Sequence, residues 1–200
     1  MGPSIVFVVD DDVSVRESLE LLISSEGWEA RTFASAEEFL AHPRPNVPSC
    51  LVLDVSLPDL NGLELQERLS RDPTEMPIVF ITGYGDVPIT VRAMKAGAIE
   101  FLTKPFSSDT MLNAIRGALE RSGEITVLRD RYTSLTRRER EVMALVVSGL
   151  LNKQVGAKLG ISEITVKAHR GTMMRKMKAR SLPDLVRMSE QLNLRSAQGS

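Results

Sequence analysis

Residues 4–121 alternate short runs of β-branched residues with stretches in which apolar residues recur at helical spacing. This alternation restricts the fold more than any other feature of the chain. Strands are predicted at residues 4–9, 29–33, 50–53, 78–82 and 98–102, and helices near 14–26, 36–41, 62–71, 87–96 and 108–121. Such an order predicts an α/β domain with a five-stranded, doubly wound parallel sheet. The first, third and fourth strands are apolar almost throughout, which is typical of strands covered on both faces.

The second half shows helical patterns only. Thr136 and Glu139 form a capping-box pattern, and Asn152, Ser162 and Ser181 are predicted to cap the next three helices. The helices are expected at about 137–148, 152–159, 163–178 and 182–192, with stops at Gly149 and Gly160. The prediction is a small all-α domain of four helices.

Charge divides the chain at about the same place. The net charge is −1 overall, but residues 1–122 hold 10 Lys and Arg against 19 Asp and Glu, a net −9. Residues 123–200 hold 15 against 7, a net +8. The division predicts two domains with different partners, of which the basic one is the candidate for nucleic acid.

The boundaries expected from these patterns are a first domain at 1–121, a linker at 122–134, a second domain at 135–194 and a disordered tail at 195–200. Ser122, Gly123 and Glu124 are expected to break the fifth helix. The rest of the linker fits either a rigid helical connector or a loose segment, and the sequence does not choose between them.

Composition excludes several classes of protein. The mean hydropathy is −0.06 and no apolar run is long enough to span a bilayer. The first residues carry no basic leader, so no signal peptide is expected. The single cysteine, Cys50, excludes an internal disulfide and a cysteine-based zinc site. A cytoplasmic protein without a membrane partner is therefore expected.

Polar residues follow four of the five predicted strands. Asp10 and Asp11 follow the first strand, Asp54 the third, Thr82 closes the fourth, and Lys104 follows the fifth. In a doubly wound sheet these strand ends meet at one edge, where ligands bind. Each residue alone has an ordinary explanation as a helix cap, a turn residue or a solvated charge. Together they predict a site.

The chemistry of this site follows from its charges. Three crowded carboxylates either raise their pKa values or hold a dication, and Mg²⁺ suits few carboxylates with room for phosphate oxygens; Mn²⁺ is the alternative. Asp54, directly after an apolar run, is the expected nucleophile toward phosphorus. Lys104 would neutralise charge on the transferred group and Thr82 would donate a hydrogen bond to it. Asp12 is expected only to cap the following helix.

Four segments together resemble the receiver domains of two-component response regulators, which have a flavodoxin-like fold. They are Val8-Val9-Asp10-Asp11-Asp12, Leu53-Asp54-Val55-Ser56-Leu57-Pro58-Asp59-Leu60-Asn61-Gly62, Ile81-Thr82-Gly83-Tyr84-Gly85-Asp86 and Phe101-Leu102-Thr103-Lys104-Pro105-Phe106. The resemblance implies transfer of a phosphoryl group from a histidine kinase to Asp54. It implies that Asp11, Asp54 and the backbone carbonyl of Ser56 bind Mg²⁺, with Asp10 acting through water.

The same resemblance implies a switch in which Thr82 and Phe101 reorient together, and a cis peptide bond between Lys104 and Pro105. Ser56 and Tyr84 would border the phosphoryl group and affect its hydrolysis. Beside the switch, an exposed face of apolar and oppositely charged residues is expected to form a two-fold dimer on phosphorylation. Its residues are Val91, Lys95, Ile99 and Glu100.

Residues 152–178 have helix-turn-helix spacing, with a tight turn at 160–162. Four residues of the longer helix are expected to pack inward: Val166, His169, Met173 and Met177. Five are expected mainly on the opposite face, which could enter a major groove: Lys167, Arg170, Gly171, Arg175 and Lys178.

This domain resembles LuxR-type domains, most closely the FixJ branch, through segments 135–139, 149–153, 164–170 and 176–183. The resemblance implies binding to double-stranded promoter DNA. By analogy Lys167 and Arg170 face bases, and Lys153, Thr165 and Arg180 contact phosphates. Gly171 departs from the family, which usually places a larger residue there.

Competing classes fit less well. A haloacid-dehalogenase-like phosphatase carries a second acid two residues after its nucleophile, where this chain has Ser56, and the chain leaves no room for a cap over a substrate. A nucleotide-binding enzyme would need a Gly-rich loop after the first strand. A receiver-linked adaptor that acts through protein contacts stays open as the alternative. The prediction is a phosphorylation-controlled transcription regulator that catalyses only its own phosphorylation and dephosphorylation.

Overall fold

The first of two compact units contains a five-stranded parallel sheet. The computed structural model describes residues 4–44, 46–70, 76–83, 87–192 and 194, and the units comprise residues 1–126 and 127–200. The strands are β1 (Ile5–Val9), β2 (Glu29–Phe33), β3 (Ser49–Asp54), β4 (Ile78–Thr82) and β5 (Glu100–Thr103). Their order is β2-β1-β3-β4-β5, with every neighbouring pair parallel. The predicted doubly wound sheet is therefore confirmed.

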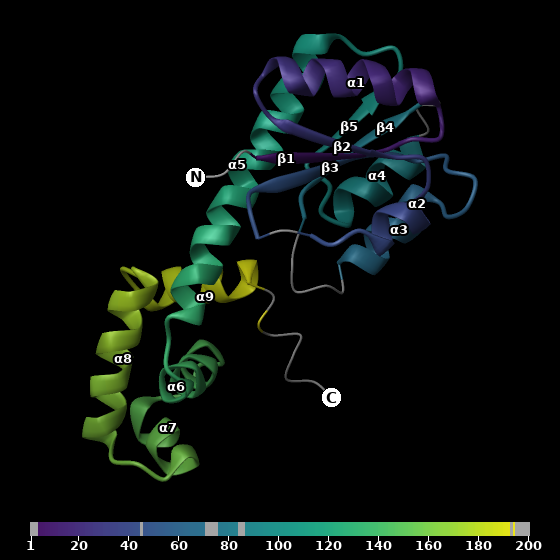
Figure 1. Ribbon diagram of the computed structural model, residues 1–200. Coiled ribbons are helices and arrows are strands. Elements are labelled where there is room, and N and C mark those ends of the chain that lie inside the picture. The colour runs from purple at the N-terminus through teal and green to yellow at the C-terminus, as the bar shows by residue number, and fades with distance from the viewer. Residues whose placement is uncertain (1–3, 45, 71–75, 84–86, 193, 195–200) are drawn as a thin grey trace. The chain divides into compact units, whose positions relative to one another are not determined.

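Helices cover both faces of this sheet (Figure 1). They are α1 (Val13–Ser25), α2 (Ala36–Ala41), α3 (Gly62–Leu69), α4 (Val87–Lys95) and α5 (Ser108–Thr133). Successive strand residues point to opposite faces, so β1 sends Val6 and Val8 into a core with α1 and α5. Phe7 and Val9 enter a second core with α2, α3 and α4. Burial on both faces explains why β1, β3 and β4 are apolar almost throughout.

The fifth strand begins later than its sequence pattern predicts. Ala98 belongs to the turn after α4, where its N–H donates to the carbonyl of Ala93 at 3.1 Å. Ile99 donates to the carbonyl of Ile78 at 2.8 Å and leads into β5. The apolar run of the sequence therefore includes a buried turn residue as well as the strand.

The predicted break in the fifth helix is wrong. α5 continues through Ser122, Gly123 and Glu124 to Thr133. The Ser122 hydroxyl is buried and accepts the backbone N–H of Ser49 at 2.9 Å, while the carbonyl of Ser122 accepts the Thr126 hydroxyl at 2.9 Å. The serine read as a helix breaker is thus held by a tertiary contact with β3. Residues 122–133 are helical, which answers the question that the sequence left open.

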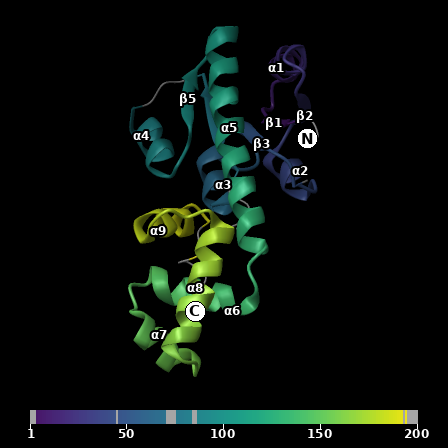
Figure 2. The same cartoon turned by 90° about the vertical axis from the view of Figure 1, so that its left-hand side faces the viewer.

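The second unit contains four short helices around a core of its own (Figure 2). They are α6 (Arg137–Val147), α7 (Asn152–Leu159), α8 (Glu163–Met177) and α9 (Leu182–Gln191). The capping box of Thr136 and Glu139 is confirmed, as are the caps at Ser162 and Ser181. No described helix is long and apolar enough to cross a membrane.

The expected cap of α7 is wrong by one residue. Leu151 is the N-cap, and its backbone N–H donates to Gln154 Oε1 at 2.8 Å. Asn152 is instead the first helical residue, and its side chain serves another contact described below. Gln154 therefore satisfies the N–H of the N-cap residue, while no side chain of Leu151 caps the first turn of α7.

Two glycines, one within α7 and one at its C-terminal end, allow the connection between α7 and α8. Gly160 has a left-handed backbone with φ of 65°, which glycine adopts at little cost. One turn earlier, a Cβ added at Gly156 would lie 2.7 Å from the carbonyl oxygen of Ile161. The close approach of α7 to the start of α8 therefore requires a residue without a side chain.

Candidate functional site

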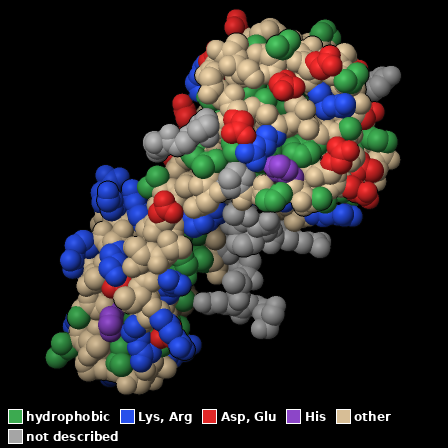
Figure 3. Space-filling model, in the orientation of Figure 1, with side chains coloured by type: hydrophobic (Ala, Val, Ile, Leu, Met, Phe, Trp, Pro, Cys, Tyr) green, Lys and Arg blue, Asp and Glu red, His purple; other side chains and the backbone are tan. Residues whose placement is uncertain are grey.

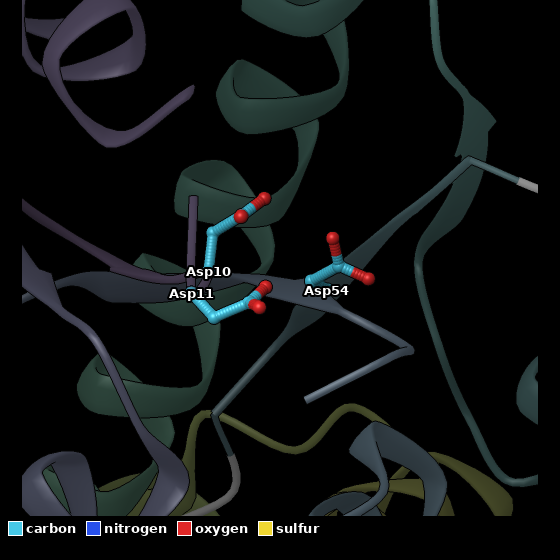
Figure 4. A group of neighbouring side chains, drawn as sticks. All are labelled: Asp10, Asp11 and Asp54. Carbon is cyan, nitrogen blue, oxygen red and sulfur yellow. The ribbon is translucent and has the colours of Figure 1, made fainter. Parts of the chain in front are cut away.

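Three carboxylates gather at the carboxyl ends of β1 and β3 (Figure 4). Asp10 directly follows β1, Asp11 comes next, and Asp54 is the last residue of β3. One oxygen from each side chain lies within 4.8 Å of the others. Asp10 is fully buried and Asp54 is 5% exposed, whereas Asp11 is exposed. The cluster therefore has two buried members and one open to solvent.

Lys104 is the cation of this cluster. Its Nζ donates to Asp10 Oδ2 at 2.7 Å and to Asp54 Oδ2 at 2.6 Å. Burial raises the pKa of Asp10 above its ordinary value, and the hydrogen bond from Lys104 only partly opposes this. Burial by itself would lower the pKa of Lys104, but its two carboxylate partners raise it. Lys104 therefore stays charged between two buried acids.

Backbone groups hold the carboxylates in place. Asp54 Oδ1 accepts the N–H of Ser56 at 2.8 Å, and Asp10 Oδ1 accepts the N–H of Asp12 at 2.9 Å. Asp12 caps α1 as predicted, accepting the N–H of Ser14. The guanidinium of Arg16 donates to the carbonyls of Asp10 and Asp11 at 2.7 and 2.9 Å. Sequence reasoning missed Arg16, whose spacing from the acids looks like an ordinary helix surface.

Gly62 was also missed as a site residue. A Cβ added there would lie 2.5 Å from the carbonyl oxygen of Asp54. Its N–H donates to the carbonyl of Val55 at 3.0 Å. The start of α3 thus packs directly on the backbone of the residue at the centre of the site. The sequence signal that could have identified Gly62 is a glycine at the start of a helix, eight residues after Asp54.

Thr82 ends β4 and Lys104 follows β5, whereas Phe101 lies within β5 opposite Phe80. Thr82 is 2% exposed at the end of β4, and its carbonyl accepts the N–H of Lys104 at 2.7 Å. The Lys104–Pro105 bond is cis, as the resemblance implied. Phe101 is half-buried, with its ring 6.0 Å from that of Phe80. The structure places the expected switch residues on neighbouring strands.

Two further predictions concern residues that border the phosphoryl group and the residues of the dimer face. Ser56 is exposed beside Asp54. Tyr84 lies outside the described residues. On the proposed dimer face, Val91, Lys95 and Glu100 are exposed and Ile99 is half-buried.

Sequence reasoning missed two apolar side chains of α4. Val87 and Met94 are 71% and 42% exposed, and Val91 is 43% exposed. Their spacing of four and three residues places the three on one side of the helix. Ala93 is the one buried residue of the helix. Of these three, only Val91 was expected on an exposed face, and the structure adds Val87 and Met94 to it.

Basic side chains gather over the second unit (Figure 3). Lys153, Lys167 and Arg180 are exposed, as expected of residues that meet DNA. Lys167 Nζ lies 3.0 Å from Glu163 Oε1 within the first turns of α8. Thr165 is half-buried, and its backbone N–H donates to the capping hydroxyl of Ser162.

Arg170 differs from the other basic residues. It is half-buried, and its Nη1 donates to Asn152 Oδ1 at 3.0 Å. The guanidinium therefore joins α8 to the start of α7 instead of extending freely from the helix. Any contact of Arg170 with a base would use its remaining donors.

The sheet with its acid–lysine cluster and the helix-turn-helix unit define a class: a phosphoacceptor domain joined to a DNA-binding domain. Family models agree. Residues 6–116 match the response regulator receiver domain, and residues 133–189 match the bacterial regulatory proteins of the luxR family. The chain belongs to the response regulators that join a receiver domain to a LuxR-type domain, and it is a phosphorylation-controlled transcription regulator.

The chain is similar to several known proteins along almost its whole length. Nodulation protein W of Bradyrhizobium diazoefficiens is 52% identical over 198 residues, covering 96% of this chain and 87% of that protein. Transcriptional regulatory protein FixJ of Rhizobium meliloti is 42% identical, covering 92% and 94%. The solved response regulator StyR is 49% identical with a TM-score of 0.60, covering 95% of this chain and all of that one. Full-length FixJ from B. japonicum is 36% identical with a TM-score of 0.52, covering 95% and 97%.

Proposed function

We propose that Asp54 accepts the phosphoryl group, with a sensor histidine kinase as the donor. The observation that carries this is the position of Lys104 Nζ between Asp54 and Asp10, at 2.6 and 2.7 Å. A carboxylate oxygen of Asp54 forms a new bond to phosphorus, and the bond from phosphorus to the donor imidazole nitrogen breaks. The imidazole keeps the electron pair of that bond. Lys104 is placed to neutralise charge on the transferred group.

The carboxylates fit Mg²⁺, with Mn²⁺ as a substitute. They are hard oxygen donors, and one oxygen from each lies within 4.8 Å of the others. Asp11 is exposed to solvent, and Mg²⁺ needs such access because it keeps several of its water ligands. Asp11, Asp54 and the backbone carbonyl of Ser56 would hold the ion, with Asp10 acting through water. A bound dication would neutralise phosphoryl charge and orient its oxygens. Catalysis by this chain is limited to its own phosphorylation and dephosphorylation.

The phosphorylated state is read by Thr82 and Phe101. Thr82, at the end of β4, donates its hydroxyl to the phosphoryl group, and Phe101 changes rotamer with it. Ser56, exposed beside Asp54, borders the group and affects how fast it is hydrolysed. The adjoining face of Val91, Lys95, Ile99 and Glu100 then pairs with a second copy. The exposure of Val91 and its apolar neighbours on α4 supports this face.

The second domain binds double-stranded promoter DNA in the cytoplasm. Lys167 and Arg170 are the proposed base contacts, and Lys153, Thr165 and Arg180 the proposed phosphate contacts. The exposure of Lys153, Lys167 and Arg180 supports these roles. Arg170 would read a base while Asn152 holds its guanidinium in orientation.

Mass spectrometry tests the phosphoacceptor. After incubation with acetyl phosphate and Mg²⁺, the intact protein should gain one phosphoryl group, and Asp54→Asn should gain none. Asp59→Asn is the matched control, because Asp59 is an exposed acid of the same loop whose carboxylate accepts the N–H of Glu37. Phosphorylation of an aspartate in Asp54→Asn would refute the assignment.

Binding to DNA is tested by two substitutions that differ in kind, because phosphate contacts carry affinity and base contacts carry specificity. Lys153→Ala should weaken binding to specific and random duplexes alike and lower the salt slope by about one unit. Arg170→Ala should cost about 1–3 kcal/mol on the specific site and relax base choice there. The specific site is expected to hold two half-sites about one helical turn apart. If the Arg170→Ala protein selects the unaltered consensus from random DNA, Arg170 does not read a base.

A further inference from the structure

One stripe of α8 faces away from the core of the second unit and is mostly apolar or small. Its members recur every three or four residues and are all exposed: Ile164, Lys167, Ala168, Gly171 and Arg175. The opposite side of the helix carries the buried Val166, Met173 and Met177. The outward stripe therefore contributes no packing to the core, so core packing does not explain why Ile164, Ala168 and Gly171 are apolar or small.

Ile164 is the least expected member of the stripe. It is 79% exposed, the most of any large apolar side chain in the described part of the chain. It lies in the first turn of α8, next to the N-terminal end that a helix-turn-helix protein presents to base edges. A β-branched side chain is stiff at χ1, so it loses little freedom when it meets a partner.

Gly171 gives an independent indication that something approaches this stripe closely. A Cβ added there would meet nothing within 4 Å, so the fold does not require glycine. A glycine inside a helix is destabilising relative to alanine. Ala168 is the other small residue of the stripe. Small residues that the fold does not require suit a helix that lies deep in a groove.

The geometry points to Ile164 as a specificity-determining residue that reads thymine. An exposed apolar side chain in the major groove recognises the C5-methyl group of thymine, which no other base carries. Lys167, one turn further along the stripe, offers its charge to a neighbouring base such as guanine. This inference rests on the proposed binding to DNA and names the base that Ile164 recognises. Each half-site of the operator then contains a thymine contacted by Ile164.

Uracil substitution tests the contact, because uracil differs from thymine only by the methyl group. The full-length protein, treated with acetyl phosphate and Mg²⁺, first selects a duplex from random DNA. Each thymine of that duplex is then replaced by deoxyuridine in turn. At one thymine per half-site, the replacement should weaken wild-type binding about fourfold, the equivalent of one buried methyl group. The same replacement should not change the affinity of the Ile164→Ser protein for the duplex. The Ile164→Val protein should keep part of the preference for thymine over uracil.

Leu151→Ser is the matched control, since Leu151 is 70% exposed in the same unit but lies outside α8. It should discriminate thymine from uracil as the wild type does. The inference is overturned if no thymine is sensitive, if Ile164→Ser stays sensitive, or if Leu151→Ser loses the discrimination equally. It is also overturned if Ile164→Ser changes the sedimentation of the protein without DNA, which would make Ile164 a contact between copies. Failure of the wild type to retain any duplex would instead refute the proposed binding to DNA itself.

Discussion

The ammonium of Lys104 lies 2.6 Å from Asp54 Oδ2 although the two residues are 50 positions apart in the chain. The same nitrogen contacts Asp10, which is fully buried. Three strands therefore have to stop at the same edge of the sheet for this contact to form. The pair is a product of the topology β2-β1-β3-β4-β5 and would be lost in most other orders of the strands.

Replacing this cation should slow phosphorylation. Lys104→Met removes the positive charge that faces the incoming phosphoryl group while keeping a side chain of similar length. Removing one preorganised charge of this kind typically costs about 10²–10³-fold in rate. The rate is measured with acetyl phosphate by mass spectrometry at fixed Mg²⁺. Lys104→Arg, which keeps the charge, should lose less, and equal rates for Lys104→Met and wild type would contradict the role.

Gly62→Ala should disturb the receiver domain through the backbone of Asp54. The added Cβ would lie 2.5 Å from the Asp54 carbonyl oxygen, so α3 has to shift. Overpacking of this kind costs about 1–3 kcal/mol in the free energy of unfolding, and phosphorylation should slow as well. Gly117→Ala is the matched control, because a Cβ there meets nothing within 4 Å. Urea unfolding measures the change in stability, and the acetyl phosphate assay measures the change in rate. A Gly62→Ala protein as stable as wild type would contradict the close packing of α3 on Asp54.

Two glycines of the helix-turn-helix should respond in opposite directions to alanine. Gly171→Ala should raise the free energy of unfolding by about 0.5–1 kcal/mol, because it removes backbone freedom from the unfolded chain and meets open space. Gly156→Ala should lower it by about 1–3 kcal/mol, because its Cβ would lie 2.7 Å from the Ile161 carbonyl oxygen. Thermal unfolding followed by circular dichroism distinguishes the two, and changes of the same sign would be inconsistent with this packing.

Glu139 should make the stability of the second unit depend on pH. Its side chain is 5% exposed, and Oε2 of its carboxylate lies 2.7 Å from Lys176 Nζ. Burial alone would raise the pKa of Glu139, but Lys176 and the N–H of Thr136 lower it below its ordinary value near 4.5. A lowered folded pKa adds stability that is complete above the unfolded value and is lost as the pH falls through the folded value.

Glu139→Gln should therefore cost about 1–3 kcal/mol at pH 7, since it removes a charged hydrogen bond. The difference from wild type should shrink as the pH falls below about 4.5. Urea unfolding at pH 7 and at pH 4 measures this difference. Glu141→Gln, which breaks only pairs with the exposed Arg137 and Arg138, should change much less. A cost that does not depend on pH would rule out the ion pair as its cause.

Features of this protein that depend on local sequence patterns could be predicted from the sequence. Strand ends predicted the positions of Asp10, Asp54, Thr82 and Lys104, because parallel strands all point their carboxyl ends one way. Capping residues predicted the starts of α6, α8 and α9 for a similar reason, since each acts within one turn of its own helix.

Features that depend on distant contacts were not predictable in this way. α5 continues through Ser122, whose hydroxyl accepts a hydrogen bond from Ser49, 73 positions away. The tie of Arg170 to Asn152 crosses from one helix to the next, so the spacing within α8 placed that arginine on the outer face. The exposure of Ile164 likewise became evident only when the outward face of α8 was known.

DNA affinity measured with and without phosphorylation tests the central claim most directly. Fluorescence anisotropy of a duplex selected from random DNA gives the Kd of wild type and of Asp54→Asn, each before and after treatment with acetyl phosphate and Mg²⁺. Treatment should tighten wild-type binding about 5- to 150-fold, the usual range of coupling between two sites. Asp54→Asn should bind with the same Kd in both conditions. If treatment tightens Asp54→Asn as much as wild type, or changes neither, Asp54 does not control the binding of DNA.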